Sequence, residues 1–274
     1  MQVKVGGKYI DMTAGGGGVI REIIVAGGQV LGIDWDEDAI GFLQLEFGQE
    51  IGEKKLILEK ANFARIRNLA KKHNFLSCDG IVFDLGVSQY QLETTARGFS
   101  FIREGPLDMR MDRSLKITAK DLVTALPAGE LARLFGRFGE EKANLIAAEI
   151  VKARVGAPIK TTTQLANIIR KIVKVRRKID PATKVFLALR AAVNFELENL
   201  KTALPLAFSI LGKGGKVAVL SFHSAEDAIV KEFFKTTPGL MVLTPKPVRP
   251  KAAEVLANPA ARSVRLRVAK RLMN

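Results

Sequence analysis

Short apolar runs alternate with helix-like stretches through the first 100 residues, and this alternation constrains the fold more than any other feature. The apolar runs that predict strands are Lys8–Met12, Gln29–Asp34, Leu56–Lys60 and Gly80–Leu85. The helix-like stretches between them are Ile20–Ala26, Asp36–Phe47 and Phe63–Lys72. Strands that alternate with helices in this way are typical of a parallel sheet in an α/β domain.

After Asp112 the pattern becomes helical. From Thr118 to about Val175 the apolar residues follow a helical period, and no run predicts a strand. Thr161-Thr162-Thr163 before Gln164 has the form of a capping box and predicts a helix over Leu165–Val173. The sequence therefore predicts an inserted all-helical domain over residues 113–180.

The chain then returns to the pattern of the first part. Asp180-Pro181 predicts the start of a helix that continues toward Leu200, and Lys216–Ser221 predicts a buried strand followed by a helix capped by Ser224. Leu240–Thr244 and Ser263–Ala269 predict two final strands with antiparallel pairing. We expect one mostly parallel, Rossmann-like sheet with an antiparallel last strand, formed by residues 1–112 and 181–274.

The net charge is +15, and the excess lies after residue 100. Residues 1–100 carry 11 Lys or Arg and 13 Asp or Glu, residues 101–200 carry 19 and 11, and residues 201–274 carry 13 and 4. A near-neutral first part joined to a basic remainder suggests a small-molecule site beside a polyanion-binding surface. A basic surface that serves only solubility is the alternative.

Cysteine content and hydropathy indicate a cytoplasmic protein. Cys78 is the single cysteine, which excludes an internal disulfide and fits a reducing compartment. The sequence has no uncharged apolar stretch of membrane-spanning length, and its start has no signal-peptide pattern. With two histidines and one cysteine there is no cluster of zinc-ligand spacing, so we expect no metal.

A glycine-rich turn follows the first predicted strand. It comprises Gly15, Gly16, Gly17 and Gly18, and Val19 comes next. Glycines let a backbone turn sharply and approach a ligand closely. The dinucleotide fingerprint fits poorly because its third glycine position holds Ile20. We therefore favour a loop around an uncharged or zwitterionic group, with a purely structural turn as the alternative.

Acidic residues end the second and fourth predicted strands. Asp34 can accept both hydroxyl protons of a ribose, a device that specifies a nucleoside but no reaction. Asp84 lies at the same carboxyl edge, along which ligands bind in open α/β sheets. Phe63, after the third strand, can cover an adenine or belong to the core. Together these residues predict a nucleoside site.

Several longer motifs closely resemble the RsmH (MraW) family of ribosomal RNA methyltransferases. They are Asp84-Leu85-Gly86-Val87-Ser88 with Gln91-Leu92, Arg97-Gly98-Phe99-Ser100-Phe101, Gly105 through Asp112, Arg137 through Glu141, Pro181-Ala182-Thr183, Gly215 through Asp227, and Asn258 through Ser263. The similarity covers nearly the whole chain, and the segment from Asp79 to Asp112 is highly specific.

The resemblance implies a class I methyltransferase sheet that binds S-adenosylmethionine. It implies methyl transfer to the exocyclic N4 of a cytidine in the decoding region of 16S ribosomal RNA, with the helical insert helping to recognise RNA. We expect the substrate within the small ribosomal subunit and the protein as a monomer or homodimer. The implied cofactor contacts are Gly17, Gly18, Asp34, Phe63, Asp84 and Gln91.

The chain departs from the family pattern at three places. Val19 stands where the family's glycine loop usually ends in histidine, so a polar contact is lost there. Asp180 replaces the histidine that usually precedes Pro-Ala-Thr. The family also carries a stretch before the first strand, whereas this chain starts almost at that strand; we expect weaker cofactor binding if that stretch closes the pocket in relatives.

Candidates for the chemistry are two aspartates and one histidine. The cytosine N4 must lose conjugation and a proton, and Asp84 or Asp108 can accept its N–H. His223 can position the base or take the proton, or merely bond a backbone group. Asp108 and Asp112 flank Arg110, so a structural salt-bridge loop is the rival interpretation for Asp108.

Aromatic and basic residues suggest contacts to RNA. Phe99 and Phe101 can stack on an extruded base or form loop core. A run of six positive charges in nine residues predicts a phosphate-contacting edge; its members are Arg170, Lys171, Lys174, Arg176, Arg177 and Lys178. Two rival functions remain: a nicotinamide-dependent oxidoreductase, and a non-catalytic RNA-binding or ribosome-assembly protein.

Overall fold

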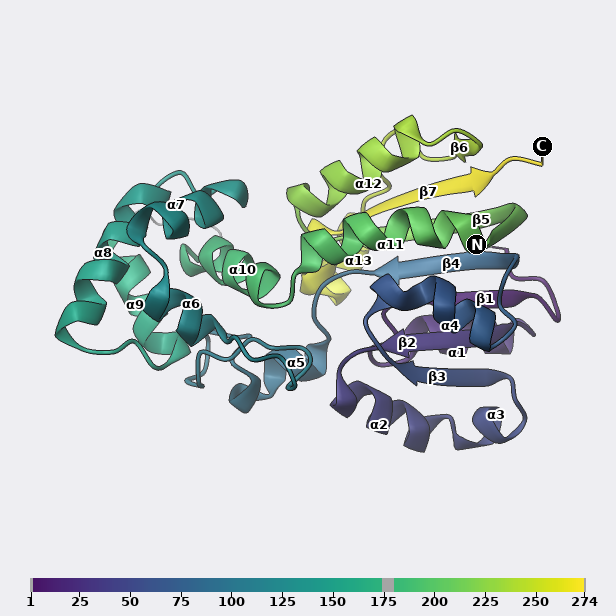
Figure 1. Ribbon diagram of the computed structural model, residues 1–274, viewed down its shortest axis with the longest axis horizontal. Coiled ribbons are helices and arrows are strands. Elements are labelled where there is room, and N and C mark those ends of the chain that lie inside the picture. Colours follow the sequence, from purple (N-terminus) through teal and green to yellow (C-terminus); the bar gives the residue numbers. More distant parts are fainter. Residues whose placement is uncertain (1, 174–179, 274) are drawn as a thin grey trace. The chain divides into compact units, whose positions relative to one another are not determined.

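A computed structural model describes residues 2–173 and 180–273, and its central element is a seven-stranded sheet (Figure 1). The strand order is β3-β2-β1-β4-β5-β7-β6. The strands are β1 Lys8–Asp11, β2 Gln29–Asp34, β3 Leu56–Lys60, β4 Cys78–Asp84, β5 Leu211–Ser221, β6 Leu240–Val242 and β7 Arg265–Arg271. β1 to β5 pair in parallel, and β7 pairs antiparallel with both β5 and β6. The predicted sheet, including its antiparallel last strand, is confirmed.

The chain divides into two compact units, and the sheet belongs to the first. The sheet unit comprises Met1–Gly86 and Leu197–Asn274, and the helical unit comprises Val87–Glu196. The sequence analysis placed the insert at residues 113–180. In the structure, residues 87–112 and 181–196 also belong to the helical unit. Asn194 shows why: its fully buried amide donates to the Met109 carbonyl and accepts from the Met111 N–H, at 2.7 Å each.

Helices cover both faces of the sheet in the sheet unit. They are α1 Gly18–Val25, α2 Glu37–Glu46, α3 Gly48–Gly52, α4 Ile66–Lys72, α11 Glu196–Ile210, α12 Ser224–Thr236 and α13 Ala252–Ala257, with short 3-10 turns at Phe63–Arg65 and Pro259–Ser263. One core packs α4, α11 and α12 against the sheet, and a second packs α1 and α2 on the other face. Alternate residues of each strand supply the two cores, as the pleat requires.

The helical unit contains seven described helical segments. They are α5 Gln89–Glu93, a 3-10 turn at Thr95–Arg97, α6 Ala119–Ala125, α7 Ala128–Arg137, α8 Ala143–Gly156, α9 Thr162–Ile172 and α10 Ala182–Val193. Apolar residues at helical spacing are fully buried, for example Leu131 and Phe135 in α7 and Leu165 and Ile169 in α9. The capping box of Thr161 with Gln164 forms as predicted. No described helix is long and apolar enough to cross a membrane.

Two local predictions are wrong. The helix expected from Asp180 to Leu200 is two helices, because α10 ends at Val193 and Phe195 adopts a left-handed φ of 51° before α11. The helix after β5 is capped by His223 rather than by Ser224, because His223 has extended backbone and its ring accepts the Glu226 N–H. No Gly or Pro in the sequence marks either the end of α10 or the start of α12.

Candidate active site

The carboxyl ends of three neighbouring parallel strands carry aspartates. β1, β2 and β4 end in Asp11, Asp34 and Asp84. β1 lies between β2 and β4, and the strand order reverses there. In open α/β sheets, ligands bind outside the carboxyl ends of the strands at such a reversal. The structure therefore places the predicted Asp34 and Asp84 on the edge where a ligand is expected.

The glycine turn between β1 and α1 is open on one side and packed on the other. Gly15 and Gly17 have φ of 47° and 79°, in the left-handed region. A Cβ on Gly17 would lie 2.6 Å from the ring of Phe47, so this position requires glycine for packing as well. At Gly16 and Gly18 a Cβ would meet no atom within 4 Å. That open side lets a ligand approach the backbone closely.

Val19 and Phe63 border this edge with apolar surface. Val19 packs against the core beneath α1 and α2. Phe63 is half-buried, and its ring meets Phe83 edge-on with centroids 5.9 Å apart. Phe63 thus contacts the core and remains partly exposed.

Asp34 ties the end of β2 to the glycine turn. Its Oδ2 accepts the Gly15 N–H at 2.8 Å, and its Oδ1 accepts the Asp36 N–H at 2.9 Å. Burial raises the pKa of Asp34, and these backbone hydrogen bonds oppose that rise. Each carboxylate oxygen has a second lone pair, so Asp34 can still accept two hydroxyl protons.

Of the three strand-end aspartates, Asp84 has the carboxylate with the fewest hydrogen bonds to described residues. Its backbone N–H donates to the Thr13 hydroxyl at 2.7 Å, and among described residues no donor is bonded to its carboxylate. Although the residue reaches solvent, desolvation of the carboxyl and, to a smaller extent, the charge of Glu226 together raise the pKa of Asp84 to about 6. A carboxylate with a pKa near 6 is suited to accept a proton at neutral pH.

Asp11 and Thr13 form a link that sequence reasoning missed. The Thr13 N–H donates to Asp11 Oδ1 at 3.1 Å, and the Thr13 hydroxyl holds Asp84 in place. Asp11 is 1% exposed. Burial, opposed by the hydrogen bond from Thr13 and aided by the charges of Asp84 and Asp34, raises the pKa of Asp11 to about 7. The available signal was the pattern Asp-x-Thr directly before the glycines.

The raised pKa of Asp11 makes the stability of the ligand-free protein depend on pH. The folded state keeps a proton on Asp11 that the unfolded chain releases near pH 4. The free energy of unfolding therefore falls as the pH rises from about 4 to about 7. We expect Asp11→Asn, which keeps the acceptor for Thr13, to stabilise the protein at pH 8 by up to roughly 4 kcal/mol and by much less at pH 5. Urea unfolding at both pH values measures this. An equal gain at both would contradict it.

Asp108 and Gln91 both lie in the helical unit. Asp108 forms a bidentate ion pair with Arg110, at 2.7 and 2.8 Å. Partial burial raises its pKa, but the hydrogen bonds and charge of Arg110 outweigh this and hold the pKa below its usual range. Gln91 is 6% exposed and forms a capping box with Ser88 at the start of α5. The geometry of Asp108 thus supports the salt-bridge interpretation.

His223 serves the start of α12. Its Nδ1 accepts the Glu226 N–H at 3.4 Å, and its Nε2 lies 3.1 Å from Glu226 Oε1. Glu226 is buried and also accepts the backbone N–H groups of Phe222 and His223, at 2.9 and 3.3 Å. This arrangement supports the interpretation that His223 bonds a backbone group. Sequence reasoning missed Glu226. The available signal was its position three residues after His223, the spacing of a capping box.

The residues predicted to contact RNA are partly engaged within the helical unit. Arg170 forms an ion pair with Asp180 at 2.8 Å and lies over the ring of Phe101. Phe101 packs edge-on against Phe186 with centroids 4.8 Å apart, and Phe99 is 6% exposed. These contacts favour loop core for both rings. Lys171, in α9, is exposed, and the other members of the basic run, Lys174, Arg176, Arg177 and Lys178, lie outside the described residues.

Comparison with known proteins gives one consistent answer. The model of the MraW methylase family matches residues 1–272. The ribosomal RNA small subunit methyltransferase H of Thermomicrobium roseum is 44% identical over 97% of this chain and 88% of its own. Those of Syntrophobacter fumaroxidans and Coprothermobacter proteolyticus are 43% and 42% identical, over 96% and 97% of this chain and 89% and 90% of their own. As the motifs from Asp79 to Asp112 predicted, this chain belongs to the MraW methylase family.

Proposed function

We propose that this protein transfers a methyl group from S-adenosylmethionine to the exocyclic N4 of a cytidine in 16S ribosomal RNA. The observation that carries the proposal is the edge formed by the glycine turn, Asp34 and Asp84 in a chain of this family. The names of its relatives, ribosomal RNA small subunit methyltransferase H, support the substrate. We place the substrate in the small ribosomal subunit and the protein in the cytoplasm, as a monomer or homodimer.

The residues at this edge fit S-adenosylmethionine. The open backbone at Gly16 and Gly18 can receive the zwitterionic amino-acid portion, Asp34 the ribose hydroxyls, and the partly exposed Phe63 the adenine. When bound, the cofactor supplies a methyl group on a sulfonium, ready for in-line displacement. Asp34 already bonds both the glycine turn and α2's entry, so the protein holds its ribose acceptor in place before binding.

Asp84 is our candidate for the proton. The N4 lone pair is delocalised into the cytosine ring, and an acceptor for an N–H turns it toward the methyl carbon. On receiving a methyl group N4 must lose a proton, which Asp84 could accept with its free carboxylate. Its pKa of about 6 keeps it ionised at neutral pH while leaving it basic enough for this role.

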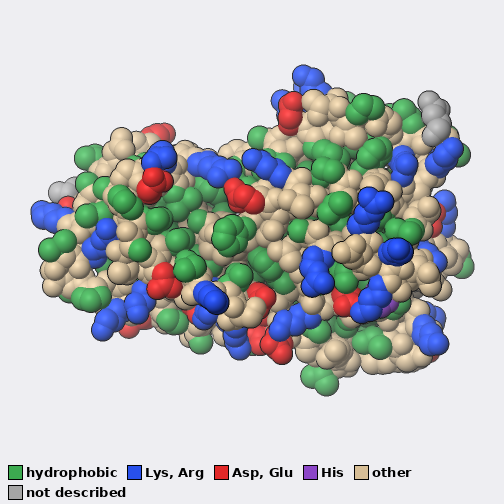
Figure 2. All heavy atoms as spheres, viewed as in Figure 1, with side chains coloured by type: hydrophobic (Ala, Val, Ile, Leu, Met, Phe, Trp, Pro, Cys, Tyr) green, Lys and Arg blue, Asp and Glu red, His purple; other side chains and the backbone are tan. Residues whose placement is uncertain are grey.

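Basic surface supports the RNA part of the proposal. Figure 2 shows Lys and Arg side chains spread over the drawn surface of each unit, with fewer acidic side chains among them. We assign RNA recognition to the helical unit and to the basic last third of the chain, which carries 13 Lys or Arg and 4 Asp or Glu. Phosphate contacts of this kind contribute most of the sequence-independent affinity for RNA.

Methyl transfer to ribosomal RNA is the direct test. The purified protein is incubated with labelled S-adenosylmethionine and small ribosomal subunits that lack this methylation. We expect mass spectrometry of digested RNA to show one methyl group per subunit, on a cytidine N4. Label on another atom would change the assigned acceptor. Cofactor binding without any transfer would favour the non-catalytic assembly role, and binding of a nicotinamide cofactor instead would favour an oxidoreductase.

A further inference from the structure

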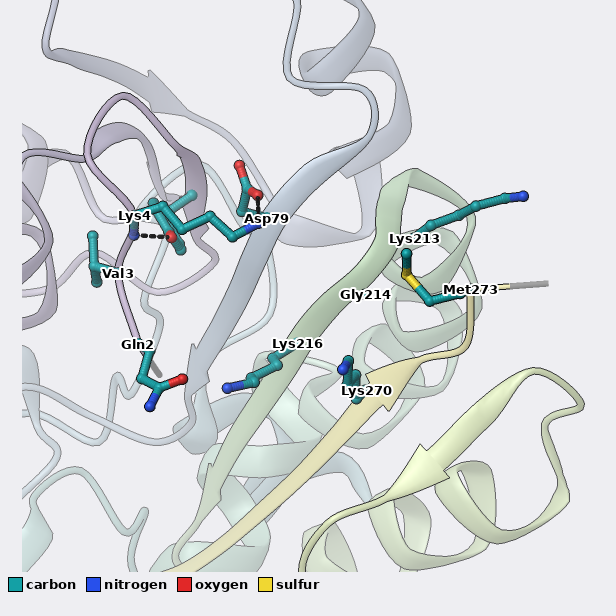
Figure 3. A pocket seen from close by; sticks show the side chains of 10 residues that line it. Gln2, Val3, Lys4, Asp79, Lys213, Gly214, Lys216, Lys270 and Met273 are labelled. Atoms are coloured by element: carbon teal, nitrogen blue, oxygen red, sulfur yellow. Dashed lines mark hydrogen bonds and ion pairs between the residues drawn. The ribbon is translucent and has the colours of Figure 1, made fainter.

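A basic hollow lies at the other end of the strands, away from the candidate active site. It has a volume of about 370 Å³ and lies entirely within the sheet unit (Figure 3). Its lining joins the start of the chain, the amino ends of β4 and β5, and the end of β7. Four lysines and one aspartate supply its charged groups: Lys4, Lys213, Lys216, Lys270 and Asp79.

Only one of these lysines has an acidic partner among the described residues. Lys4 Nζ lies 2.8 Å from Asp79, which also accepts the Lys8 backbone N–H at 3.0 Å. Asp79 is therefore already engaged. Lys213, Lys216 and Lys270 make no ion pair or side-chain hydrogen bond with any described residue. The hollow thus presents three cations without a counter-charge.

The position of two of these lysines is unfavourable without an anion. Lys216 and Lys270 lie directly opposite each other in the antiparallel pairing of β5 with β7. Their neighbours Val217 and Ala269 belong to the core beneath α11 and α12, so both lysines project from the opposite face of the sheet. Both are half-buried. Like charges directly opposite on neighbouring strands destabilise a sheet, and lysine is disfavoured in strands.

We propose that this hollow binds backbone phosphate groups of the RNA substrate. An ammonium group binds phosphate as a compact point charge, and an anion between Lys216 and Lys270 would turn their repulsion into attraction. Figure 3 shows these two on neighbouring strands, and Lys213 further back along β5 with its side chain directed away from them. The choice of RNA as the source of the phosphate rests on the proposed function.

The hollow is too far from the active edge to hold the reacting nucleotide. Lys216 precedes Ser221, at the carboxyl end of β5, by five residues, which spans roughly 17 Å at the rise of a strand. A phosphate at Lys216 therefore belongs to another part of the RNA. The site adds affinity and orientation without touching the methyl donor.

The test compares two variants with the same change in charge. The hollow variant carries Lys213→Gln, Lys216→Gln and Lys270→Gln. The control carries Lys54→Gln, Arg67→Gln and Lys71→Gln, at exposed residues of the near-neutral first 100 residues without described ion pairs. Binding of a small-subunit ribosomal RNA transcript is measured by fluorescence anisotropy between about 50 and 200 mM salt.

We expect the hollow variant to bind RNA at least about tenfold more weakly and to show a salt slope shallower by about 2, since each phosphate contact contributes about 0.7–0.9. The control should stay within about twofold of wild type, because exposed charges are screened. The melting temperature of the hollow variant without RNA should equal or exceed that of wild type; if the triple variant does not fold, Lys216→Gln and Lys270→Gln are compared singly.

Equal RNA binding by the hollow and control variants would overturn the proposal. If the hollow variant alone also loses calorimetric binding of inorganic phosphate, the hollow serves a small anion instead. S-adenosylhomocysteine binding should be unchanged in both variants. Absence of methyl transfer by wild type would instead count against the proposed function, so the two failures are distinguishable.

Discussion

Asp34→Ala is expected to weaken S-adenosylhomocysteine binding by about 100-fold or more, measured by isothermal titration calorimetry. Two charge-assisted hydrogen bonds to ribose hydroxyls are lost, at about 1.5–3 kcal/mol each, and about 3 kcal/mol corresponds to roughly two powers of ten. The variant also frees the Gly15 N–H from its acceptor at 2.8 Å. The glycine turn then loses its fixed position, which adds to the loss.

A neighbouring carboxylate provides the control. Glu37 lies at the start of α2, is exposed, and among the described residues forms an ion pair with Lys60 at the surface. Glu37→Ala removes the same charge close to the same edge, so we expect its affinity to remain within about threefold of wild type, as surface ion pairs contribute little. Near-wild-type affinity of Asp34→Ala would remove Asp34 from the cofactor site.

Most of the sheet could be predicted from the sequence, because period and strand ends are local signals. β2 and β3 begin and end at the predicted residues. The first half of β5, Leu211–Gly215, was missed because it contains three glycines and a lysine, which are uncommon in strands. It is a strand because β4 pairs with it across a register shift between Cys78 and Gly80. Tertiary pairing there overrides local propensity.

Some residues of the candidate site could likewise be predicted from local sequence signals, and others could not. Asp34 and Asp84 were predictable because each ends an apolar run, and parallel strands bring such ends to one edge. For Asp108 and His223 the sequence left a catalytic and a structural role open, and the distances to Arg110 and Glu226, which no sequence pattern gives, favour the structural role. The basic hollow could not be predicted from the sequence at all. Lys216 and Lys270 become neighbours only through the antiparallel pairing of β5 with β7.

Asp84→Asn is expected to lower the rate of methyl transfer by about 10²–10⁴-fold in single-turnover assays with saturating cofactor and RNA, the range for loss of a general base. Asparagine keeps the shape and the backbone bond to Thr13 but cannot take a proton. In wild type the rate should fall tenfold per pH unit below about 6, because protonation of Asp84 removes the acceptor. In Asp84→Asn this pH dependence should disappear. A persistent inflection near pH 6 would assign the proton to another group.

Two further variants identify the group that titrates. Glu226 raises the pKa of Asp84 through its charge, so Glu226→Gln should move the inflection to lower pH. Asparagine is a good N-cap residue, so His223→Asn should keep α12 and leave the inflection near pH 6. If His223→Asn abolishes the inflection, His223 takes the proton. His223→Asn is the sharper criterion, because Glu226 lies 3.1 Å from His223 and also raises the pKa of Asp84, so the loss of its charge reaches both groups.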